Sequence, residues 1–186
     1  MRILARILAI SIAAIFVSAS AEPIFLPLGK YDEGVLIPAD SGLKFGKFDT
    51  YDSAHFIGRI LVEGMFVIEC WDCEPGIEGH RLKMSIVPDP QTAARLPHWK
   101  KQDNDIVIGL VGAEPLIRAF VTSAQRKLLL SGKLGEIRGR TAIIVDRYTA
   151  SLDCDSADYS ARFVAIAKVT KLADTRTNGN YGCGFL

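Results

Sequence analysis

Two cysteines at redox spacing are the most suggestive chemistry in this chain. Cys70 and Cys73 form a C-x-x-C motif, which in thioredoxin-like proteins is a redox pair whose first thiol lies at a helix N-terminus. Here the motif follows a strand-like segment and runs into Glu74-Pro75-Gly76, and no helical period follows it. Asp72 and Glu74 would also raise a neighbouring thiol pKa, because negative charge disfavours a thiolate. The motif therefore favours structural disulfides, and the alternative is a thiol–disulfide oxidoreductase that uses Cys70 and Cys73.

The four cysteines are expected to form two disulfides. Cys154 and Cys183 complete the set, and an even count is typical of bridged extracellular domains. In one pairing the C-x-x-C reaches Cys183, and Cys154 takes the remaining cysteine. In the other, the C-x-x-C closes on itself and Cys154 pairs with Cys183; the spacing does not decide. A zinc site would need Cys154, Cys183 or His80 as further ligands, so one C-x-x-C is only half of such a site. We expect no metal and no other cofactor.

The first 21 residues are expected to be a cleavable secretory signal. Arg2 and Arg6 are basic, an apolar run of 11 positions covers 7–17, and residues 18–21 read Ser-Ala-Ser-Ala. A basic start, a short apolar middle and small residues at the cleavage point define such signals. A membrane-spanning helix needs about 20 apolar residues. We therefore expect cleavage near Ala21, a mature chain in the periplasm or secreted, and no membrane span in it.

The charge balance argues against nucleic-acid binding. Without Arg2 and Arg6, 20 basic residues stand against 21 acidic ones, so the mature chain has a net charge near −1. Nucleic acids and anionic lipids attract proteins with a basic excess, which this chain lacks. We expect no nucleic-acid partner.

Aromatic residues beside cations are the candidates for ligand or partner binding. His98-Trp99-Lys100-Lys101 joins an aromatic face to two cations and could stack on a sugar or grip a protein. The simpler interpretation is that Trp99 packs on the core and that Lys100 and Lys101 are solvated. Trp71 and Tyr148 are further aromatic candidates. Together they predict binding of an envelope protein or a glycan, and the sequence does not choose between these partners.

No catalytic motif accompanies these residues. The chain has no G-x-S-x-G, no H-E-x-x-H and no glycine-rich phosphate loop. His55, His80 and His98 do not stand at metal-binding spacing from one another. We therefore expect a non-enzymatic binding or protein-interaction module.

Alternation of apolar and polar residues predicts the strands that position these candidates. The sharpest period-two pattern covers 54–70, where Gly58 and Gly64 on the inner side indicate bends or close backbone approach. Pro115 begins a pattern of period four over 114–129, which predicts one amphipathic helix. Asp89 and Pro90 are typical of the start of a short helical turn. The remaining expected strands cover 81–87, 105–111, 137–150 and 160–169.

The order of these elements indicates a mainly β fold, with one helix between the third and fourth of five strands. This is the order of the five-stranded OB-type barrel, and other small curled α+β sheets share it. We expect the globular domain to cover 54–172, after an irregular lead-in over 22–53 with at most one short strand. The tail over 173–186 is expected to be tethered by Cys183.

Overall fold

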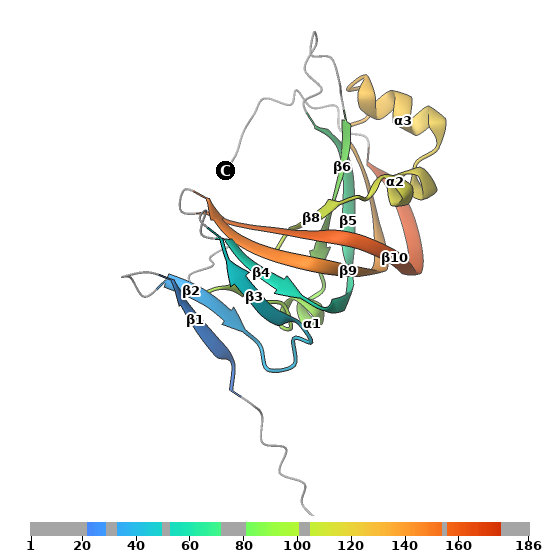
Figure 1. Cartoon of the computed structure of the whole chain (residues 1–186). Helices are drawn as coiled ribbons and strands as arrows, with labels where there is room; N and C mark the ends of the chain where they lie inside the picture. Colours follow the sequence, from blue (N-terminus) through green and yellow to red (C-terminus); the bar gives the residue numbers. More distant parts are fainter. Residues whose placement is uncertain are drawn as a thin grey trace, which may run out of the picture.

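The computed structural model of the chain describes residues 22–28, 33–49, 53–71, 81–100, 105–153 and 156–175. These residues form a mainly β fold with a curled sheet and few helices, which confirms the predicted fold class (Figure 1). The expected signal peptide over 1–21 and the tail beyond 175 lie outside them. Within the described ranges, no helix is both long enough and apolar enough to cross a membrane.

Five strands pair in a closed ring, which we call the strand ring. It consists of β5 (Arg59–Trp71), β6 (Arg81–Pro88), β8 (Ile108–Val111), β9 (Glu136–Asp153) and β10 (Ser156–Thr175). β5 pairs with β6 and β9, β10 pairs with β8 and β9, and β6 pairs with β8. All pairings are antiparallel except β8–β10, which is parallel. Alternate residues of β5 from Ile60 to Ile68 are buried, so the inner side of the predicted alternation faces the core.

β4 (Ser53–Ile57) continues into β5 through a bend, and with β3 (Lys44–Phe48) it extends the sheet along β9. The bend lies at Gly58, whose φ of 122° is a conformation that side chains disfavour. A Cβ on Gly64 would overlap the Val87 carbonyl oxygen, because β6 approaches β5 closely at this point. The predicted roles of both glycines are therefore confirmed: one bends the strand and the other admits a neighbouring backbone.

The segment before β4 contains three strands, so the expectation of at most one short strand over 22–53 is wrong. β1 (Ile24–Leu28) pairs with β2 (Glu33–Ile37), and β2 also pairs with β7 (His98–Trp99) in a small antiparallel sheet. β3 belongs to the larger sheet.

Proline and glycine conceal these strands in the sequence. Pro27 lies in β1, which pairs only with β2 among the described residues, and such an edge strand tolerates a residue without an N–H. Gly34 of β2 lies so close to β1 that a Cβ would overlap the Leu26 carbonyl oxygen. Here proline marks an edge strand and glycine marks a close approach of two strands. From the sequence alone, the many prolines and glycines had indicated a loop.

Two helices stand where the period-four pattern predicted one over 114–129. α2 (Glu114–Phe120) and α3 (Ser123–Leu130) are separated by the extended residues Val121 and Thr122, so the single-helix expectation is wrong. Thr122 caps α3: its hydroxyl accepts from the Gln125 backbone N–H, and the Gln125 side chain accepts from the Thr122 backbone N–H. α2 and α3 lie at one end of the molecule and β1 and β2 at the other (Figure 1).

The predicted helical turn after Asp89 is the short helix α1 (Pro90–Ala93). Pro90 occupies its first turn as expected, but Asp89 makes no side-chain cap bond. The Asp89 carboxylate pairs instead with the Arg140 guanidinium of β9. This ion pair ties the start of α1 to the strand ring.

Candidate functional site

A row of small and polar residues crosses the outer surface of the sheet, and we call it the polar row. Its members are direct cross-strand partners: Ser85 of β6, Gly109 of β8, Ser160 of β10, Thr149 of β9 and His55 of β4. Their chain neighbours Ile86, Ile108, Tyr159, Tyr148 and Phe56 are buried. Because successive side chains of a strand point to opposite faces, the polar row points outward. Each of its members is half-buried.

Both ring nitrogens of His55 have partners. Nε2 lies 2.8 Å from Asp49 Oδ2, and Nδ1 lies 3.2 Å from Thr149 Oγ1. A carboxylate can only accept, so in the neutral ring Nε2–H donates to Asp49 and the unprotonated Nδ1 accepts from the Thr149 hydroxyl. The three side chains form an Asp–His–Thr chain of hydrogen bonds that ends on an oxygen.

The turn between β3 and β4 holds Asp49 in place. Its Oδ1 accepts from the Ser53 backbone N–H at 3.1 Å, and its own N–H donates to the Ser53 carbonyl at 3.0 Å. Solvent reaches the pair, because the His55 and Asp49 side chains are 37% and 28% exposed. Carboxylate, imidazole and hydroxyl in this order are the parts of an activated nucleophile.

A second cluster, which we call the Trp71 corner, lies where β5 ends and β6 begins. The Trp71 side chain is 51% exposed, and Lys83 Nζ lies 4.0 Å from its ring centroid. Lys83 Nζ also lies 3.1 Å from Glu69 Oε1. Glu69 faces Lys83, and Trp71 faces Arg81 across the β5–β6 pair, so all four residues share the outer face. The corner therefore offers an ordered indole beside two cations and one carboxylate.

An ion pair crosses the outer face between β9 and β10. Arg162 Nε and a terminal guanidinium nitrogen each donate to one oxygen of the Asp146 carboxylate at 2.7 Å. These hydrogen bonds from Arg162 are the main reason why the pKa of Asp146 lies below its ordinary value. Arg162 is therefore occupied within the sheet and contributes no unpaired charge to the polar row.

Two of the predicted ligand-binding residues belong to the core. Trp99 is 3% exposed, and Tyr148 is fully buried. The indole Nε1–H of Trp99 donates to the Ser151 carbonyl at 3.0 Å, and the Tyr148 hydroxyl donates to the Pro97 carbonyl at 2.8 Å. The expectation that Trp99 and Tyr148 contact a ligand is corrected, because their ring faces and polar tips are used inside the fold.

The same core contains a pair of stacked tyrosines. The ring centroids of Tyr148 and Tyr159 lie 6.1 Å apart, and the Tyr159 hydroxyl accepts from the Trp99 backbone N–H at 3.2 Å. Burial raises the pKa of Tyr159 to about 12 and that of Tyr148 well above its ordinary value, because a buried phenolate loses its hydration.

The rest of the predicted aromatic and cationic segment belongs to the small sheet or follows it directly. His98 is half-buried, and its Nδ1 lies 3.0 Å from the Leu96 carbonyl oxygen. Lys100 is exposed, and its Nζ lies 5.1 Å from the Phe25 ring centroid. Lys101 lies outside the described residues. Trp71, predicted only as a further aromatic candidate, lies beside Lys83, a cation that was not among the predicted binding residues.

Among the described residues Cys70 is the one cysteine, so no disulfide joins two of them. Cys70 is half-buried near the end of β5. Cys73, Cys154 and Cys183 lie outside the described residues, and the pairing stays a prediction. In the described part of the chain, no three histidine, cysteine, aspartate or glutamate side chains form a group that could hold a metal.

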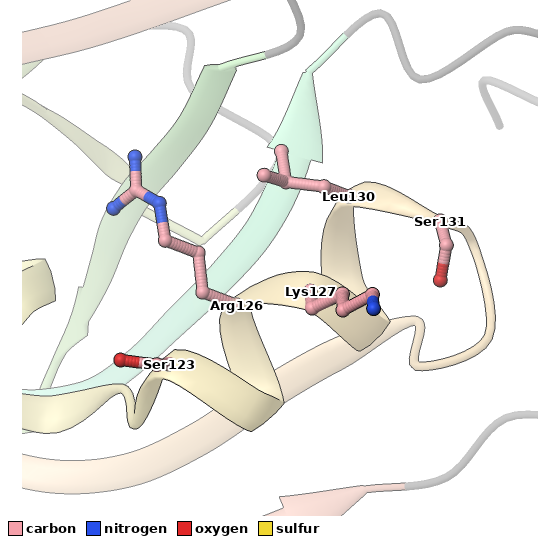
Figure 2. A pocket seen from close by; sticks show the side chains of 5 residues that line it. All are labelled: Ser123, Arg126, Lys127, Leu130 and Ser131. Carbon is pink, nitrogen blue, oxygen red and sulfur yellow. The ribbon is translucent and has the colours of Figure 1, made fainter.

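A depression along α3 has a volume of about 430 Å³ and is lined by Ser123, Arg126, Lys127, Leu130 and Ser131. Figure 2 shows these side chains along the helix and the turn that follows it. Arg126 already pairs with Glu114 of α2 at 3.0 Å. The depression is lined only by residues of α3 and by Ser131, which caps the helix. None of these lining residues is a general base for the two serine hydroxyls.

The Asp49–His55–Thr149 contact was missed by sequence reasoning. His55 and Thr149 are 94 positions apart, and no motif links them. Their contact depends on the register of β4 against β9, which alternation alone does not give.

No family model matches this chain, and no curated protein and no solved structure matches it. Function therefore has to be inferred from its own residues and their geometry.

Proposed function

We propose that this chain is an exported binding module and that it binds a glycan at the Trp71 corner. The observation that carries the proposal is the exposure of Trp71, whose indole is half open to solvent although its ring is already ordered by Lys83. Tryptophan is enriched among the residues that contribute most of the binding energy at contact sites.

The chemistry of the corner suits a sugar. An indole face packs against the C–H face of a pyranose ring, while charged groups at its border bind hydroxyls. Lys83 and Arg81 supply donors, and Glu69 supplies an acceptor. Because Lys83 is held by both Glu69 and the indole, little side-chain freedom remains to be lost on binding.

The order of strands supports the same location. We propose that the strand ring is an OB-like barrel, in which β5 and β6 are the first two strands. OB-type barrels bind oligosaccharides and oligonucleotides on one face and on the loops at its border, including the loop between these two strands. Trp71 is the last residue of β5 before that connection. This support is an analogy of fold, and the side chains of the corner carry the chemistry.

Fluorescence titration tests the proposal directly. The chain has two tryptophans, and Trp99 is buried, so a sugar that stacks on Trp71 should change the emission of the exposed one. The mature chain from Glu22 is titrated with soluble peptidoglycan fragments and with neutral oligosaccharides. Trp71→Ala lacks this reporter, so its affinity is measured by calorimetry beside the wild type; it should be at least about tenfold weaker, which corresponds to about 1.4 kcal/mol.

Ile57→Ala is the matched control, because Ile57 is a 60% exposed apolar side chain on β4, away from the β5–β6 connection. It should bind like the wild type. Equal binding by Trp71→Ala, or no saturable response to any glycan, contradicts the proposal. Retention of a stoichiometric envelope protein that is lost in Trp71→Ala would replace the glycan with a protein partner.

A further inference from the structure

We propose that Thr149 is an ester-cleaving nucleophile, with His55 as its general base and Asp49 as the residue that positions His55. This site is separate from the Trp71 corner and goes beyond ligand binding. It also differs from the sequence-based expectation of a non-enzymatic module, because the catalytic set exists only once β3, β4 and β9 are paired.

The hydrogen bonds assign a role to each atom. Asp49 Oδ2 accepts from His55 Nε2–H at 2.8 Å, which leaves the lone pair of Nδ1 directed at Thr149 Oγ1, 3.2 Å away. A nucleophile within hydrogen-bond reach of a base that a third group orients is the general arrangement for covalent catalysis. The Ser53 backbone holds the other Asp49 oxygen, so the imidazole is oriented by a fixed carboxylate.

The surroundings leave room for a substrate. His55 and Thr149 lie on the outer face, and the His55 side chain is 37% exposed. In the polar row, Ser160 lies next to Thr149, and Gly109 lies next to Ser160. The space beside Gly109 is open, because the nearest atom to an added Cβ would be the Tyr159 carbonyl oxygen at 3.7 Å. An acyl group can therefore approach Thr149 along the Ser160–Gly109 side, where the row carries no large side chain.

The neighbouring donors favour a polar or anionic acyl group. Lys47 is the cross-strand partner of His55, and Ser160 is the partner of Thr149. Cross-strand side chains lie about 5 Å apart at Cβ. The strand positions of Lys47 and Ser160 thus lie on either side of the reacting pair, and an ammonium and a hydroxyl on these side chains can donate to oxygens of the substrate.

The reaction balances without any further reagent than water. Thr149 Oγ attacks the ester carbonyl carbon, and its proton passes to His55 Nδ1. The carbon–oxygen bond to the alcohol breaks, and the leaving oxygen takes that proton. Water then attacks the acyl-Thr149 carbonyl, gives a proton to His55 Nδ1, and releases the carboxylic acid as the proton returns to Thr149 Oγ.

The test uses p-nitrophenyl acetate as the probe and the mature chain from Glu22. Acetylation is mapped by mass spectrometry, and release of p-nitrophenolate is followed in parallel. The acetyl group should appear on Thr149 at least about 100-fold faster than in His55→Gln, which is the lower end of the contribution of a general base. Thr149→Ser should retain the reaction, and Thr149→Val should abolish it at this position.

Asp49→Asn separates positioning from folding. It should slow acetylation of Thr149 and should also shift the imidazole nitrogen resonances of His55 away from the Nε2–H tautomer, a change that a purely structural role would not produce. Wild-type protein that acquires acetyl groups only on lysines, or that labels Thr149 as fast in His55→Gln, overturns the proposal. Acetylation is read on Thr149 with p-nitrophenyl acetate and needs no glycan, so failure here is distinguishable from failure of the proposed glycan binding at the Trp71 corner.

Discussion

Gly64 and Gly109 both lie in strands of the ring, yet an added methyl group would meet different surroundings at each. On Gly64 it would overlap the Val87 carbonyl oxygen and lie 2.9 Å from Pro88 Cα, and both of these are backbone atoms. Backbone in a paired strand cannot rotate away as a side chain can. Gly64→Ala should therefore destabilise the fold by about 3 kcal/mol, at the upper end for overpacking, as measured by urea unfolding.

Gly109→Ala is the matched comparison. Its new Cβ would have the Tyr159 carbonyl oxygen at 3.7 Å, an ordinary contact, and the position needs no positive φ. A glycine replaced where the backbone already suits alanine gains up to about 1 kcal/mol, because the unfolded chain loses freedom. The free energy of unfolding should stay level or rise. Equal losses in the two variants would show that strand propensity, and not the close approach of β6, decides the result.

Single residues also show where sequence reading reached its limit. The glycines at 58 and 64 could be predicted, because each interrupts a regular alternation at a defined face. The burial of Trp99 and Tyr148 could not, since it follows from contacts with Ser151 and Pro97 across 52 and 51 positions of sequence. The sequence pattern of an aromatic residue next to cations is the same whether the ring is exposed to solvent or buried in the core.

The break between α2 and α3 is an element-scale feature with a local cause. Thr122 and Gln125 exchange side-chain and backbone hydrogen bonds at 2.9 and 3.2 Å, which satisfies two donors at the start of α3. Thr122→Ala removes the acceptor for the Gln125 N–H and should cost about 1 kcal/mol of unfolding free energy. Thr122→Ser keeps the hydroxyl and should restore most of it.

Urea unfolding of Thr122→Ala and Thr122→Ser checks this prediction, with helix content from circular dichroism as a second measure. A loss of equal size in both variants would assign the effect to the lost methyl group and not to the cap. The Thr-x-x-Gln spacing of a capping box stands in the sequence at 122–125, so this break could have been predicted. The period of four continued across it and concealed the signal.

Some strands could be predicted from the sequence and others could not. Those of the ring were predictable because one face of each is buried, which imposes alternation over many residues. β1, β2 and β3 have five residues each and carry glycine or proline, so too few alternating positions remain to distinguish them from loops. The Asp49–His55–Thr149 chain depends on β3, β4 and β9 at once, and no local pattern encodes the register of three strands.

At the scale of the molecule, the core tyrosines connect the two sheets. The Tyr159 hydroxyl of β10 accepts from the Trp99 backbone N–H of β7. The Tyr148 hydroxyl of β9 donates to the carbonyl of Pro97, the residue before β7. The small β1–β2–β7 sheet is therefore attached to the strand ring through buried polar groups. A buried N–H or carbonyl that loses its partner costs about 1–3 kcal/mol, so this attachment should be sensitive to small changes.

Alkaline pH offers a way to measure that attachment in the intact chain. Burial raises the pKa of Tyr159 from 10.0 to about 12, and the nearby Asp158 adds to the rise while the hydrogen bond from Trp99 opposes it. In the unfolded chain the phenol ionises first, so the stability that the buried neutral form contributes is fully present below pH 10 and is lost as pH rises toward 12. The free energy of unfolding should fall across this window.

Tyr159→Phe isolates the contribution of this one phenol, because every other titrating group is common to both proteins. Near neutral pH the variant should be about 1–3 kcal/mol less stable, since the Trp99 N–H loses its acceptor. Between pH 10 and 12 the difference should shrink, because only the wild type has the Tyr159 phenol to ionise on unfolding. Urea unfolding of both proteins at several pH values measures the difference, and a gap that stays constant or widens would mean that the phenol is solvated and the two sheets are joined by other contacts.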